Sequence, residues 1–328
     1  MRISRRYQGF AAMATALGLA LAGCSSSPVA VGAPPAAPQL QLGSVVTAPP
    51  STAGAAPSSC NPNAASLAPT AADANGPTLQ EIHKRGRLIV GVAQDGYLTG
   101  FLDPSTHQEA GFDVDIAEQV AEAIFNVPQS QVQKYIQFVA VTNTQRITDI
   151  TSQKIDMTVD TMTITCARLQ QVAFSSVYYE AYQRVLVLAD SGITTMKQLA
   201  GQKVCAADGS TSIATIENSP DHPVAYGVPD FSDCLVALQQ NQITAVSTDD
   251  TILAGLAQQD PNLEVIPKLT LESEPYGIAV AKKATDLEEF VNGVLANIRA
   301  NGTWERIYNE WLGPYLGQTD PPPAQYSD

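Results

Sequence analysis

The chain is poor in charged residues and in metal-ligating side chains, and both shortages narrow its function. Only 15% of its 328 residues are charged, and 32 acidic against 18 basic residues give a formal net charge of −14. A nucleic-acid binder needs a basic surface, so this balance argues against nucleic acid as a partner. No two cysteines have the C-x-x-C spacing of a zinc site. We therefore expect neither a metal nor another cofactor.

Catalytic signatures are also missing from the sequence. It contains no G-x-S-x-G, H-E-x-x-H or paired-carboxylate motif. Its histidines, His83, His107 and His222, are scattered, and we interpret them as surface residues. The sequence therefore predicts a binding protein and not an enzyme.

The N-terminus has the pattern of an export signal. Residues 1–6 are basic, and the apolar run 9–22 is shorter than the roughly 20 residues that a membrane span needs. The sequence Leu-Ala-Gly-Cys, which ends at Cys24, looks like a bacterial lipobox. We therefore expect residues 1–23 to be a lipoprotein signal peptide and Cys24 to be acylated, with an ordinary secretory signal as the alternative.

The next segment has the composition of a tether. Between residues 25 and 76, Ala, Pro, Ser, Gly and Thr predominate and Asp73 is the only charged residue. Such a sequence buries too little apolar surface to offset the cost of ordering it. We expect residues 24–76 to be a disordered tether that holds a folded domain at the outer face of the cytoplasmic membrane, and residues 319–328 to be a disordered tail.

Four cysteines remain besides Cys24, an even number that predicts disulfides in an exported protein. Four cysteines allow three pairings. Cys205 and Cys234 fall within one predicted lobe, so we pair them, which leaves Cys60 with Cys166.

Strand and helix patterns alternate from residue 78 onward. Strands are expected at residues 88–92, 136–139, 155–159, 182–188, 203–206, 245–247, 263–266 and 276–281. Helices are expected at residues 78–85, 111–125, 143–153, 195–199, 211–217, 231–240, 250–257 and 286–308, the first with a capping box at Thr78 and the last with a break near Gly302. The alternation predicts α/β architecture. A second lobe, residues 183–274, is inserted in a first lobe made of residues 77–182 and 275–318, and a ligand cleft is expected between them.

Four motifs identify a resemblance over residues 78–316. They are Gly111–Ala117, Lys154–Met157 followed by Thr163–Arg168, Val172–Ser175, and Asn301–Trp304. In this order they resemble the polar amino-acid solute-binding proteins (family 3) of ABC importers, and most of all the glutamine/glutamate-binding lipoproteins of actinobacteria. The resemblance implies a two-lobe type II periplasmic-binding-protein fold, hinges near residues 182–185 and 275–277, and a monomer that serves a permease and its ATPase.

The resemblance also implies which residues bind the two charged backbone groups of an amino-acid ligand. Arg168 would grip the α-carboxylate with its planar fork, helped by Thr163 from the same loop. Thr211, in the second lobe, would bind the same carboxylate, and the adjacent Ser212 is also expected to be a ligand-binding residue. Asp249 would take the α-ammonium. The alternatives are a surface arginine for Arg168 and plain helix caps for Thr211 and Asp249.

The resemblance implies less about the residues that contact the side chain of the ligand. Arg146 aligns with an arginine that reads a side-chain carboxylate in relatives, and its alternative is a solvated helix arginine. Thr161 flanks the site, and Asp160 departs from the serine that is common in the family, so it receives no role. Tyr97 or Phe101 would cover the aliphatic part of the ligand, with a place in the core as the alternative for both. Glutamate, aspartate, asparagine and glutamine all stay open as ligands.

Two other functions remain open on the same fold. An amino-acid sensor that signals to a membrane receptor would use the same cleft, and some proteins of this fold are lyases or hydrolases.

Overall fold

The computed structural model describes residues 44–45, 60–70 and 76–327, all within one compact unit, residues 41–328. The expected signal peptide, Cys24 and most of the tether lie outside the described residues. No helix among the described residues is long and apolar enough to cross a membrane.

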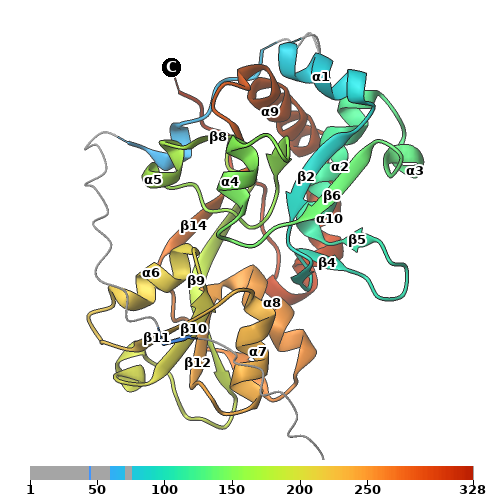
Figure 1. Cartoon of the computed structure of the whole chain (residues 1–328). Helices are drawn as coiled ribbons and strands as arrows, with labels where there is room; N and C mark the ends of the chain where they lie inside the picture. Colours follow the sequence, from blue (N-terminus) through green and yellow to red (C-terminus); the bar gives the residue numbers. More distant parts are fainter. Residues whose placement is uncertain (1–43, 46–59, 71–75, 328) are drawn as a thin grey trace, which may run out of the picture. The chain divides into compact units, whose positions relative to one another are not determined.

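Two α/β lobes, each built on its own sheet, make up the described fold (Figure 1). The sheet of the first lobe has the order β6-β2-β7-β15-β8. Its strands are β2 (Leu88–Val92), β6 (Ile136–Ala140), β7 (Met157–Thr158), β8 (Val172–Phe174) and β15 (Ala279–Ala281). Its helices are α1 (Pro77–Arg85), α2 (Phe112–Phe125), α3 (Gln129–Val132), α4 (Arg146–Thr151), α5 (Cys166–Leu169), α9 (Thr285–Ala300), α10 (Thr303–Trp311) and α11 (Gly313–Leu316). A small sheet of β3 (Asp95–Gly96), β4 (Gly100–Leu102) and β5 (Glu109–Ala110) adjoins it.

The sheet of the second lobe has the order β1-β11-β10-β12-β9-β13. Its strands are β1 (Ser44–Val45), β9 (Tyr179–Leu188), β10 (Lys203–Ala207), β11 (Val224–Val228), β12 (Ala245–Asp249) and β13 (Leu263–Val265). The helical elements are η2 (Met196–Leu199), α6 (Thr211–Glu217), α7 (Phe231–Gln239) and α8 (Asp250–Gln259). Because β10 is parallel to both β11 and β12, the loops that follow these strands lie at one edge of the sheet.

Two strands connect the lobes. β9 carries the chain from the first lobe into the second, and β14 (Ser273–Tyr276) returns it, pairing antiparallel with the start of β9 (Figure 1). The connecting strands fall where hinges were expected, although β9 begins at Tyr179, three residues before the predicted strand. The predicted two-lobe α/β fold is confirmed.

An aromatic core in the first lobe supports the start of the hinge. Gly302 has a φ of 79°, a conformation that favours glycine, and it separates α9 from α10. The turn places Trp304 in the core, where its indole N–H donates to the carbonyl of Tyr178 at 2.8 Å. Trp304 also stacks on Tyr308, with 5.2 Å between ring centroids. The C-terminal motif therefore positions the segment that leads into β9.

Several local predictions were wrong. The capping box at Thr78 does not form, because α1 begins at Pro77 after Gly76 and the distant Asp286 carboxylate accepts the Thr78 N–H at 2.8 Å. The predicted strand 276–281 is two strands, β14 and β15. The short strands β8 and β11 and the small sheet were missed, since strands of two to five residues carry little periodicity.

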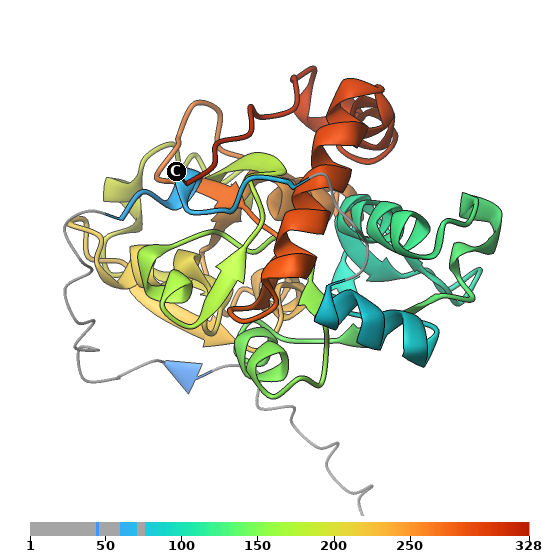
Figure 2. The ribbon, with the colours of Figure 1, turned by 90° about the horizontal axis from the view of Figure 1, so that it is seen from above.

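The end of the expected tether and the C-terminal tail are also ordered, contrary to prediction. The Glu288 carboxylate accepts the Leu67 N–H at 2.8 Å, and the Asn292 amide donates to the Ser66 hydroxyl at 2.7 Å. The Ser327 N–H donates to the carbonyl of Ser66 at 2.8 Å. Figure 2 shows this N-terminal segment, in blue, passing beside α9 with the C-terminal end next to it. Polar side chains of α9 hold the N-terminal segment, and this segment in turn binds the C-terminal tail, which composition alone could not reveal.

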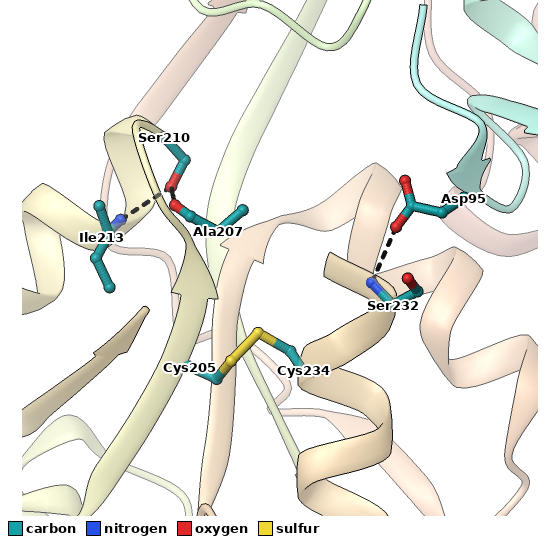
Figure 3. The surroundings of a disulfide bond; sticks show 7 residues. All are labelled: Asp95, Cys205, Ala207, Ser210, Ile213, Ser232 and Cys234. Carbon is teal, nitrogen blue, oxygen red and sulfur yellow. Dashed lines mark hydrogen bonds between the residues drawn. A yellow bond between two sulfur atoms is a disulfide. The ribbon is translucent and has the colours of Figure 1, made fainter. Parts of the chain in front are cut away.

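Both expected disulfides are present. Cys60 is joined to Cys166, which ties the N-terminal segment to the start of α5. Cys205 of β10 is joined to Cys234 of α7 inside the second lobe (Figure 3).

Candidate functional site

The two lobes touch around the loops that the sequence assigned to the ligand. The Asp95 carboxylate in the first lobe accepts the Ser232 N–H at the start of α7, at 3.1 Å (Figure 3). Gly255 of α8 packs on the carbonyl of Tyr97, where a Cβ would collide with the oxygen. The lobes are therefore in contact at these two points. Next to them, residues of both lobes line a small cavity.

Arg168 joins the loops of the two lobes. Its guanidinium donates to the Thr163 carbonyl at 2.7 Å and to the carbonyl of Gly209, in the second lobe, at 3.3 Å. The residue is 8% exposed, so it is not a surface arginine. Burial, and then the charge of Arg146, lower the pKa of Arg168 to about 9, which keeps it protonated at neutral pH. A guanidinium has five N–H donors, so several remain for a carboxylate.

A buried acid that the sequence analysis missed lies beside this arginine. Glu274 of β14 is 2% exposed, and its Oε2 accepts from the Thr163 hydroxyl at 2.5 Å and from the Thr211 hydroxyl at 2.9 Å. These two hydroxyls come from different lobes and are 3.4 Å apart. In this structure, therefore, the hydroxyls that were expected to bind a ligand carboxylate bind a carboxylate of the protein. In the sequence Glu274 is one of two acids, with Glu272, just before the hinge segment, and no local pattern marks it as buried.

Asp249 is buried at the end of β12 and is 3% exposed. Its Oδ2 accepts from the Tyr276 hydroxyl at 2.7 Å, whereas its Oδ1 is buried without a hydrogen-bond partner among the described residues. Burial raises the pKa of Asp249 well above its usual value, and the charge of Glu274 adds to this. Asp249 stands at the N-cap position of α8, but its side chain makes no capping hydrogen bond. A buried carboxylate oxygen without a hydrogen-bond partner can accept a hydrogen bond from a cationic group of a ligand.

Arg146 and Asp160 form a buried ion pair. Arg146 begins α4 and is 2% exposed, so it is not a solvated helix arginine. Its Nη1 donates to the Asp160 carbonyl at 2.7 Å and lies 3.3 Å from the Asp160 carboxylate. Burial raises the pKa of Asp160 to about 6, although the charge of Arg146 opposes this shift. Asp160, the departure from the family pattern, is thus the partner of Arg146.

The remaining predicted residues lie at different depths. Thr161 has a φ of 43°, and its N–H donates at 2.7 Å to Asp113, an acid of the Gly111–Ala117 motif. Ser212 is buried and donates at 3.1 Å to Thr248 within the second lobe. Tyr97 is 36% exposed. The structure therefore groups Arg168, Thr163, Thr211, Asp249, Arg146 and Thr161 around the contact between the lobes, while Ser212 supports it and the Tyr97 side chain lies at the surface.

A two-lobe α/β protein with buried charges of both signs where its lobes meet belongs to the class of cleft-binding proteins for small polar solutes. Residues 88–314 match the model of the bacterial extracellular solute-binding proteins, family 3, and the chain belongs to this family. It is therefore a binding protein and not an enzyme.

Named relatives agree with this assignment. The chain is 36% identical over 236 residues to the ABC transporter glutamine-binding protein GlnH of Bacillus subtilis, which covers 72% of this chain and 84% of that protein. It is 39% identical over 207 residues to a glutamine-binding protein of Geobacillus stearothermophilus, covering 63% of this chain and 77% of that protein. The crystal structure of a mutant of ArgBP from T. maritima superposes with a TM-score of 0.65 at 30% identity, over 72% of this chain and 99% of the other.

Proposed function

We propose that this chain is the lipid-anchored, extracytoplasmic substrate-binding protein of an ABC importer for an acidic or amide amino acid. The two relatives named as glutamine-binding proteins support this function. The observation that carries it is that the lobe contact holds two buried groups of opposite charge, Arg168, which bonds to the Gly209 carbonyl of the other lobe, and Asp249, whose Oδ1 has no hydrogen-bond partner among the described residues. These groups complement the two charges that every free amino acid carries.

The ligand's backbone atoms would pair with these two residues. The α-carboxylate takes the free donors of Arg168, and the α-ammonium donates to Asp249 Oδ1. Because both groups are buried, each must be matched by an opposite charge or a hydrogen bond. Glutamate, glutamine, aspartate and asparagine all satisfy these two contacts, so the side chain must decide between them.

The hinge would convert binding into a signal for the importer. Ligand that contacts both lobes stabilises the closed arrangement around β9 and β14, and a permease would recognise that arrangement. Acylation at Cys24, outside the described residues, would keep the protein at the outer membrane face. An amino-acid sensor would use the same cycle with a receptor in place of the permease.

Calorimetric titration of the mature chain with each of the twenty amino acids tests the proposal. We expect binding of at least one of the four acidic and amide amino acids, and no binding to the Arg168→Ala variant. Saturation at 100 times the dissociation constant would stabilise the fold by about 2.7 kcal/mol. Absence of binding to all four would refute the proposal. Uptake of the bound amino acid by a deletion strain then separates import from sensing, because a sensor alone would leave uptake unchanged.

A further inference from the structure

The charge of Arg146 is not free to attract an acidic side chain. Its Nη1 lies 2.7 Å from the Asp160 carbonyl and 3.3 Å from the Asp160 carboxylate, and the side chains of both residues are nearly inaccessible to solvent. A buried ion pair of this kind is locally neutral. An arginine that serves to bind a ligand carboxylate would be expected to lack such a counter-charge.

The pair nevertheless keeps hydrogen-bonding capacity. Arg146 Nε is buried and has no hydrogen-bond partner among the described residues. Leaving a buried donor unpaired costs roughly 1–3 kcal/mol. An acceptor on the ligand would satisfy it, and this acceptor need not carry a charge.

Other acids surround the cavity next to the pair. Asp160 lines this cavity together with Asp95 and Asp230, which come from the first and second lobes respectively. Asp95 is close enough to Asp160 to raise its pKa, after burial and the opposing effect of Arg146. Three carboxylates therefore line the cavity beside the Arg146–Asp160 pair, and their charge disfavours another anion there.

Resting on the function proposed above, we propose that Asp160 sets the ligand class by cancelling the charge of Arg146, so that the uncharged amide of glutamine or asparagine binds in preference to the carboxylate of glutamate or aspartate. The amide supplies both partners that this end of the cleft requires. Its oxygen accepts from Arg146, and its NH₂ group donates to a carboxylate such as Asp160. A ligand carboxylate could accept from Arg146 but would face Asp160 with no proton to share.

Two substitutions of Asp160 distinguish the effect of its charge from the effect of its size. In Asp160→Asn the side chain keeps its shape and loses its charge, so Arg146 becomes an uncompensated cation. We expect the ratio of the glutamate to the glutamine dissociation constant to fall by about tenfold or more. Asp160→Glu keeps the charge and should preserve the preference for the amide. Asp190→Asn removes the same charge from an exposed turn and should leave the ratio unchanged.

Titration of each variant with glutamine, glutamate, asparagine and aspartate gives a decisive result. Circular dichroism checks that each variant is folded, and Asp160→Ser, the residue type common in the family, replaces Asp160→Asn if that variant unfolds. Preference of the unmodified protein for the acids, or an unchanged ratio in a folded Asp160 variant, overturns the inference while leaving the proposed function intact. Absence of binding to any of the four in the unmodified protein overturns both.

Discussion

Replacement of Glu274 should loosen the contact between the lobes. Its Oε2 accepts one hydrogen bond from each lobe, at 2.5 Å from Thr163 and 2.9 Å from Thr211. Separating the lobes must break at least one of them. A hydrogen bond to a charged group contributes about 1.5–3 kcal/mol. Glu274→Ala should therefore shift the balance between closed and open forms toward the open form by roughly 10- to 150-fold.

Small-angle X-ray scattering of the ligand-free protein measures this shift as a larger radius of gyration. Glu272→Ala, which removes a neighbouring exposed acid, is the matched control. We also expect ligand to bind Glu274→Ala more weakly, because ligand must then close the lobes without the bridge. An unchanged scattering profile would contradict the bridging role. Tighter binding would show instead that Glu274 competes with the ligand for the two hydroxyls.

Three further changes should alter the stability of the fold or its affinity for the ligand. Cys60→Ser should lower the free energy of unfolding by up to about 4.7 kcal/mol, measured by urea titration, because its disulfide spans 106 residues. Burial raises the pKa of Asp113 to about 7, so the folded state binds more protons than the unfolded one between about pH 4 and 7. The free energy of unfolding should therefore rise as the pH falls from 7 to about 5. A melting temperature that decreases over the same change of pH would refute this. Gly255→Ala should force α8 from the Tyr97 carbonyl and weaken ligand binding in calorimetry.

The elements that sequence predicted well are those whose signal is local. Alternating strands and helices gave the two lobes, and the interrupted pattern near Gly302 gave the break between α9 and α10. The family resemblance, and not periodicity, singled out Arg168 and Asp249 as ligand-binding residues. In the structure both are buried near the contact between the lobes. Periodicity could not supply the boundaries of β7, which covers only Met157–Thr158.

The parts that sequence missed depend on contacts between distant residues. Glu274 binds Thr163 from 111 positions away, and no local pattern distinguishes it from a surface acid. Likewise, Ser66 reads as part of a polar linker until Asn292, 226 positions later, is placed beside it. Asp160 was recognised as unusual, but only the fold identifies Arg146 as its partner.

Two unpaired atoms give the strongest reason to expect selectivity from this cleft. Among the described residues, Arg146 Nε is a buried donor and Asp249 Oδ1 a buried acceptor, and neither has a hydrogen-bond partner. A ligand with an ammonium group and a side-chain carbonyl would satisfy both atoms. Alanine would satisfy only Asp249 and leave Arg146 Nε unpaired, at a cost of about 1–3 kcal/mol. This cost corresponds to a preference of roughly 5- to 150-fold for glutamine over alanine, since buried groups that lose their partner discriminate more strongly than apolar contacts do.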